Sequence, residues 1–96
     1  MPVSIYIATP QGGASNRRIA KLCADEWALA PQVEALADWL QVNAPTLQPD
    51  SYVADIGFSP RERALGGGPV LGPSMLGQMA GVGMSLHLSE YPNINE

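Results

Sequence analysis

Residues 51–91 constrain the fold more than any other part of the chain, because two segments within them alternate apolar and polar side chains. An alternation with a period of two is typical of a strand that has one buried face. The sequence therefore predicts strands over 52–58 and 84–89. The residues that would share the buried faces are Tyr52, Ala54, Ile56, Phe58, Met84, Leu86 and Leu88.

The connection between these two strands carries the signals of two helices. Ser59 and Glu62 have the spacing of a capping box, in which each side chain accepts the backbone N–H of the other residue. Gly66 would end this first helix after about two turns. Apolar residues then recur with helical spacing, which predicts a second helix over 73–80.

The first half of the chain supplies one further strand and one clear helix. Apolar residues alternate over 3–7, which predicts a strand. From Pro31 they recur at the spacing of an amphipathic helix, and proline suits the first turn of a helix. Residues 17–29 fit a helix capped by Ser15 or Asn16, and they also fit a strand; we favour the helix.

Together these elements predict an α+β fold in one domain that spans residues 1–96. A single small sheet of three or four strands would carry two or three helices, packed mainly on one face. A chain of 96 residues can bury a modest core without disulfides or a structural metal.

Composition argues against several classes of function. The chain has nine Asp and Glu residues against five Lys and Arg, whereas a nucleic-acid ligand needs a basic surface. Cys23 and His87 are each the single residue of their type, so we expect no metal site and no cofactor. The first residues lack the pattern of a secretory signal, and no apolar run is long enough to span a membrane. We therefore expect a cytoplasmic protein.

Acidic and aromatic side chains on the helix from Pro31 form the first candidate site. Glu34 and Asp38 are four residues apart and share a helix face. Trp39 falls outside the buried stripe, and an exposed indole beside carboxylates suits an interface anchor. We predict that these three residues bind a basic protein partner. A solvated acidic face is the simpler explanation of the same carboxylates.

Two arginines beside a run of glycines form the second candidate site. Arg61 and Arg63 lie on a short turn before Gly66-Gly67-Gly68, and arginine is enriched at interface hot spots. A solvated turn with a weak local ion pair is the alternative. The glycine run could cradle an anion, but it lacks the spacing of a P-loop or a dinucleotide fingerprint. We interpret it as a flexible connection.

The polar face of the sheet offers an alternative ligand site. His87 lies between two serines on the polar side of the last strand, and Tyr6 and Asp55 could share its face. Such a set could serve a small enzyme or a ligand-binding domain. A sheet face wetted by polar side chains is the simpler explanation.

Three segments of the second half resemble a known group of proteins. They are 53–58 (VADIGF), 71–76 (LGPSML) and 84–91 (MSLHLSEY). They resemble the C-terminal half of small uncharacterised bacterial α/β domains, several of which look like immunity proteins that neutralise a toxin from the same locus. The resemblance implies a structural likeness and brings no catalytic residue with it.

Charge, candidate residues and resemblance together predict a non-catalytic protein-binding module of the immunity or antitoxin type. Such a module would occlude the active surface of a partner toxin. Two alternatives stay open. One is a small enzyme or ligand-binding domain that uses the sheet face around His87, and the other is a structural homo-oligomer such as a homodimer.

Overall fold

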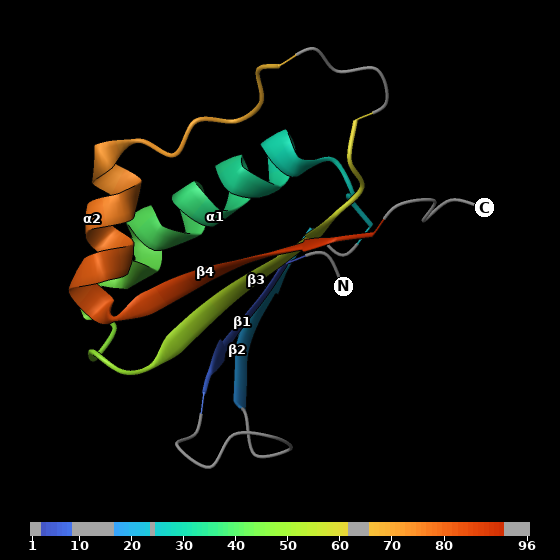
Figure 1. The fold of residues 1–96 in the computed structure, drawn as a ribbon. Helices are drawn as coiled ribbons and strands as arrows, with labels where there is room; N and C mark the ends of the chain where they lie inside the picture. Colours follow the sequence, from blue (N-terminus) through green and yellow to red (C-terminus); the bar gives the residue numbers. More distant parts are fainter. Residues whose placement is uncertain (1–2, 9–16, 24, 62–65, 92–96) are drawn as a thin grey trace.

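The computed structural model describes residues 3–8, 17–23, 25–61 and 66–91, in which four strands form one mixed sheet with two helices on one face (Figure 1). The α+β fold predicted from the sequence is confirmed. In chain order the elements are β1 (Val3–Ile7), β2 (Arg17–Leu22), α1 (Leu29–Asn43), the 3₁₀ turn η2 (Ala44–Thr46), β3 (Tyr52–Phe58), α2 (Pro73–Val82) and β4 (Met84–Glu90).

The strands lie in the order β2-β1-β3-β4. β1 pairs antiparallel with both neighbours, so that Ile5 lies opposite Ala20 on one side and Ala54 on the other. β4 is parallel to β3, and α2 lies in the connection between them. Parallel neighbours need such a long crossover, because a tight turn only reverses the chain. β2 and β4 are therefore the two edges of the sheet.

The core lies between the sheet and the two helices. Its fully buried side chains include Ile5 and Ile56 from the sheet and Leu36 and Leu40 from α1. The alternation in β1 and β3 places Val3, Ile5, Ala54 and Ile56 on the helix side, while Val53 is buried on the opposite face. From α2 the buried residues are Met75, Met79 and Val82.

The end of α2 determines how the chain enters β4. Gly83 has a φ of 81°, and its N–H donates to the carbonyl oxygens of Met79 and Ala80. The N–H of Asp50 donates to the Val82 carbonyl at 3.1 Å, which fixes this corner to the chain just before β3. A left-handed residue here ends the helix and turns the chain directly into the strand. No helix in the described residues is both long and apolar enough to cross a membrane.

The helix favoured for 17–29 is wrong, because this stretch contains β2. The register pairs Tyr6 with Arg18, whereas an unbroken ladder would pair it with Ile19. This one-residue bulge interrupts the alternation that marks a strand in a sequence. Cys23 then takes a φ of 52°, and an irregular segment leads to α1. Pairing with β1 outweighs the local helical preference.

Ser59 does not begin a helix either. Residues 59–61 are not helical, and the rest of that predicted helix, 62–65, lies outside the described residues. The Ser59 hydroxyl donates to the Tyr91 carbonyl at 3.4 Å, and the Ser59 N–H donates to the Trp27 carbonyl at 2.9 Å. The Trp27 carbonyl thus takes the Ser59 N–H that a capping box would use, and the contact with Tyr91 directs the Ser59 hydroxyl toward β4.

Candidate functional site

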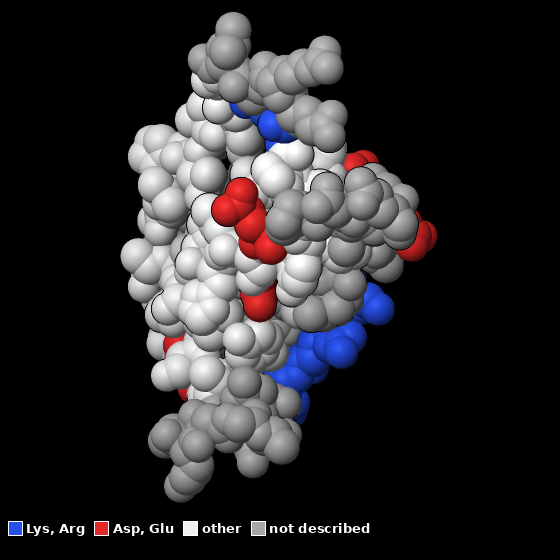
Figure 2. All heavy atoms as spheres, turned by 45° about the vertical axis from the view of Figure 1, so that its right-hand side comes forward, with Lys and Arg blue, Asp and Glu red and all other residues white. Residues whose placement is uncertain are grey.

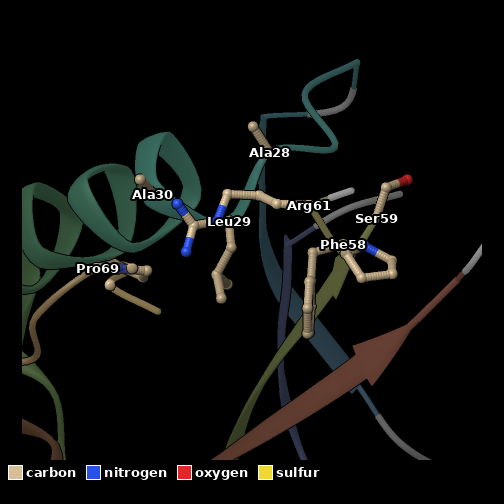
Figure 3. A pocket seen from close by; sticks show the side chains of 10 residues that line it. Ala28, Leu29, Ala30, Phe58, Ser59, Arg61 and Pro69 are labelled. Atoms are coloured by element: carbon tan, nitrogen blue, oxygen red, sulfur yellow. The ribbon is translucent and has the colours of Figure 1, made fainter. Parts of the chain in front are cut away.

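Three adjoining hollows form a trough around the first turn of α1. The middle hollow has a volume of about 340 Å³ and is lined by residues 28–30, 58–61 and 67–69 (Figure 3). The second, of about 240 Å³, shares Ala30 and Pro69 with it and continues along α1. The third, of about 390 Å³, shares Ala28 and Arg61 with the middle hollow. Neighbouring hollows therefore adjoin one another along these shared lining residues.

A buried glutamine holds two walls of the trough together. The Gln32 amide donates from Nε2 to the carbonyl of Glu26 and, at 2.8 Å, to the carbonyl of Gly57 in β3. The Glu26 carboxylate accepts the N–H of Ala28 at 3.0 Å, at the residue before α1. These hydrogen bonds fix the first turn of α1 beside the end of β3.

The end of the trough near Trp27 is closed by contacts between distant segments. The N–H of Tyr91 donates to the Phe58 carbonyl at 2.8 Å, which extends the pairing of β3 and β4. The rings of Trp27 and Tyr91 pack edge to face, with centroids 5.7 Å apart and planes at 82°. Aromatic pairs favour this geometry. The segment before α1 is thereby attached to the sheet.

Arg61 lies across the middle hollow. In Figure 3 its side chain extends from the end of β3 toward Ala30, beside Leu29 and Phe58. Its Nη2 donates to the Gly66 carbonyl at 2.6 Å. Gly66, Gly67 and Gly68 have φ values of 129°, 76° and 130°, a region that favours glycine. The glycine run thus presents a carbonyl to Arg61, and its last two residues line the hollow.

The middle of the trough is mainly apolar, and two apolar side chains near it stay exposed. Leu29, Phe58 and Pro69 line the hollow, while Val70, which lines the second hollow, is 85% exposed. Leu88 of β4 is 55% exposed and lies on the same sheet face as Phe58. Single exposed apolar residues are ordinary, but Val70 also lines a hollow and is therefore a candidate contact for a ligand or partner.

Carboxylates line both ends of the trough. Glu34 is exposed in the second hollow, and Asp25 and Glu26 line the third. Asp38 is exposed one turn further along α1. Trp39 is half-buried and packs against the core.

Of the five residues predicted to bind a partner, the structure places two in the trough, in different hollows. Glu34 and Arg61 line the trough, whereas Asp38 and Trp39 do not line any of its three hollows. Arg63 lies outside the described residues.

The alternative ligand site lies on the other face of the sheet, which no described helix covers (Figure 1). Asp55 is opposite His87 in β4 and Ser4 in β1. Tyr6 follows Ser4 by two residues and therefore shares this face. The Asp55 carboxylate accepts a hydrogen bond from the Ser89 hydroxyl at 2.8 Å. The three predicted residues thus share one face, and the carboxylate among them is already hydrogen-bonded.

Two features of the surface were not predicted from the sequence. The lining residues Leu29, Phe58 and Pro69 come from three separate segments, and none has a distinctive local pattern. The second feature is the concentration of cations on β2. Three of the five Lys and Arg residues of the chain fall within 17–22, so the composition of that segment could have revealed it.

Comparison of the chain with protein-family models, with curated proteins and with solved structures finds no match. In the part of the chain that the structure describes, no three His, Cys, Asp or Glu side chains form a group that could hold a metal ion. Function is therefore inferred from the shape, charge and apolar area of the trough.

Proposed function

We propose that this chain is a non-catalytic protein-binding module of the immunity or antitoxin type, which neutralises a partner toxin by occluding its active surface. The observation that carries the proposal is the trough, with an apolar middle and exposed apolar residues beside it. Three adjoining hollows suit several side chains of one extended protein segment. A small molecule is more commonly enclosed within a single pocket.

The charges around the trough favour a basic partner. Glu34 lies at one end, Asp25 and Glu26 lie at the other, and the chain as a whole carries a net charge of −4. Complementary charge accelerates association and disfavours partners of the wrong sign. Lysine or arginine side chains flanking an apolar residue would therefore match the trough, and such side chains are expected on a toxin surface that handles an anionic substrate.

The most direct test is binding to the purified product of the neighbouring gene. Ala30 is exposed and lines two of the hollows, so Ala30→Arg would fill the trough without touching the core. We expect the dissociation constant to rise about tenfold or more, measured by titration calorimetry. Ala80→Arg, an exposed position on α2, adds the same side chain elsewhere and should leave binding unchanged. Equal affinities of the two variants would reject the trough as the site.

A second experiment tests the role of charge. Glu34→Lys combined with Asp38→Lys should slow association, and the rate for the unmodified chain should fall as salt is added. The matched pair is Glu34→Lys alone against Asp50→Lys, each a single charge reversal. Asp50 is exposed before β3, at the end of that strand away from the trough, and its reversal should leave the association rate unchanged. Stopped-flow rates that are indifferent to both salt and charge reversal would contradict the electrostatic part of the proposal.

Occlusion requires no reacting side chain on this chain. His87→Gln should therefore leave toxin neutralisation intact, as assayed by survival of cells that express the toxin. Loss of neutralisation at unchanged folding stability would instead favour the site on the helix-free sheet face.

A further inference from the structure

One edge of the sheet gathers most of the positive charge of the described residues. Their four Lys and Arg residues are Arg17, Arg18 and Lys21, all exposed on β2, and Arg61 in the trough. Figure 2 shows most of the visible blue atoms in one stripe on the molecular surface. This acidic chain thus carries one basic strand. Its charge favours an acidic partner, whereas the trough favours a basic one.

The bulge in β2 determines how these cations point. Lys21 is opposite Ser4 and Arg18 is opposite Tyr6. Since Ser4 and Tyr6 are two residues apart, they share a face, and the two cations share it with them. In a regular strand, residues three apart would point to opposite faces. The extra residue Ile19 therefore brings Arg18 and Lys21 together on the helix-free face of the sheet.

The backbone of β2 is available for pairing on its outer side. β2 ends the sheet order, and in the described ranges no strand lies beyond it. An exposed edge of this kind is a template for an added strand. A second copy is a poor occupant, because antiparallel pairing of two β2 strands would bring cations together, and like charges on paired strands repel.

We propose that the free edge of β2 binds an acidic, extended segment of another protein as a fifth strand of the sheet. Backbone hydrogen bonds would hold the segment along residues 17–22, and carboxylates on one of its faces would meet Arg18 and Lys21. This surface is separate from the trough, and the inference does not depend on the function proposed for the trough.

The probe is a blocked synthetic peptide of about seven residues that alternates glutamate with valine. Titration of the ¹⁵N-labelled chain should shift the amide signals of residues 17–22 and leave those of the trough in place. The double variant Arg18→Gln and Lys21→Gln should weaken binding about tenfold or more. The double variant Ser74→Glu and Ala80→Glu changes the net charge by the same amount on α2 and should bind as the unmodified chain does.

Two further peptides separate strand addition from charge attraction alone. A peptide methylated at every backbone nitrogen has no N–H to donate to the ladder and should lose binding. A lysine-valine peptide should leave the amide signals of residues 17–22 in place, whatever shifts it causes in the acidic trough. Equal binding of the methylated and unmodified glutamate peptides would overturn the proposal. With the glutamate peptide, shifts centred on the trough, or no binding at about 1 mM, would also overturn it.

Discussion

The two edge strands of the sheet are built in different ways. β4 follows α2 directly, pairs with β3 over its whole length, and begins with Met84, which is buried beside Met79 and Val82. β2 has no fully buried residue, and its register with β1 slips by one position. The start of β4 therefore belongs to the buried core, whereas β2 contributes only half-buried side chains to it, namely Ile19, Ala20 and Leu22.

This difference separates folding stability from recognition. Substitutions at the start of β4 should change the free energy of unfolding, because they alter buried packing or a strained turn. Substitutions of the exposed residues of β2 should mainly change the affinity of the sheet edge for an added strand. The following experiments test whether the separation holds, beginning with the largest expected effect.

Gly83→Ala should be the most damaging change. A Cβ at this position would lie 2.4 Å from the carbonyl oxygen of Asp50, and the backbone φ is 81°. We expect a loss of about 2–3 kcal/mol in the free energy of unfolding, measured by urea denaturation. Gly81→Ala is the control on the same helix, since nothing lies within 4 Å of its Cβ, and it should gain about 0.5–1 kcal/mol. Similar denaturation midpoints for the two variants would contradict the expected clash at the turn between α2 and β4.

Met84→Ala should cost about 2 kcal/mol, because it leaves a cavity beneath α2. Leu88→Ala on the same strand should cost less than about 0.5 kcal/mol, since Leu88 is 55% exposed. Leu22→Ala on β2 should fall between them, because its side chain is half-buried against the core. Equal losses in the free energy of unfolding for Met84→Ala and Leu22→Ala, measured in the same denaturant series, would contradict the difference between the two edge strands.

Arg18→Gln with Lys21→Gln should change the free energy of unfolding by less than about 0.5 kcal/mol, because both side chains are exposed. Removing these charges also removes a barrier to pairing between copies. We expect the variant to self-associate at concentrations where the unmodified chain does not, as measured by sedimentation. A variant that unfolds readily would show that the two exposed cations themselves stabilise the fold.

The smallest effect concerns Cys23, which follows β2. Burial raises the pKa of its thiol, and the Glu26 carboxylate raises that pKa further. Glu26→Gln should therefore lower the pKa of Cys23 and speed alkylation by iodoacetamide at pH 8. A raised pKa favours the protonated thiol in the folded chain, so its contribution to stability is lost as the pH rises through the folded-state pKa. An unchanged pH profile of alkylation would exclude the influence of Glu26.

Elements with a regular pattern could be predicted from the sequence, and β2 could not. The strands over 3–7, 52–58 and 84–89 and the helix over 73–80 are present, because each has a single regular periodicity. In β2 the extra residue Ile19 removes the period of two, so a helix and a strand fit equally well. The local sequence preference favours a helix for this segment, but its pairing with β1 makes it a strand.

The trough could not be predicted from the sequence for a different reason. Its walls meet only after α1, β3 and the segment before α2 have been placed. Glu34 and Arg61 were singled out by charge, yet nothing near them in the sequence indicates that a hollow lies between. Ser59 shows the same limit, since its capping signal is local and its observed partners Trp27 and Tyr91 are distant.

The position of β1 has a consequence for the order of folding. β1 is synthesised before the other described strands, but it lies inside the sheet, between β2 and β3. Its pairing with β2 closes a short loop, whereas its pairing with β3 must wait for nearly half of the chain. Distant pairings of this kind form slowly. We therefore expect the growing chain to hold an early β1–β2 hairpin with an uncovered apolar side, and the cations on β2 to keep neighbouring nascent chains apart until β3 arrives.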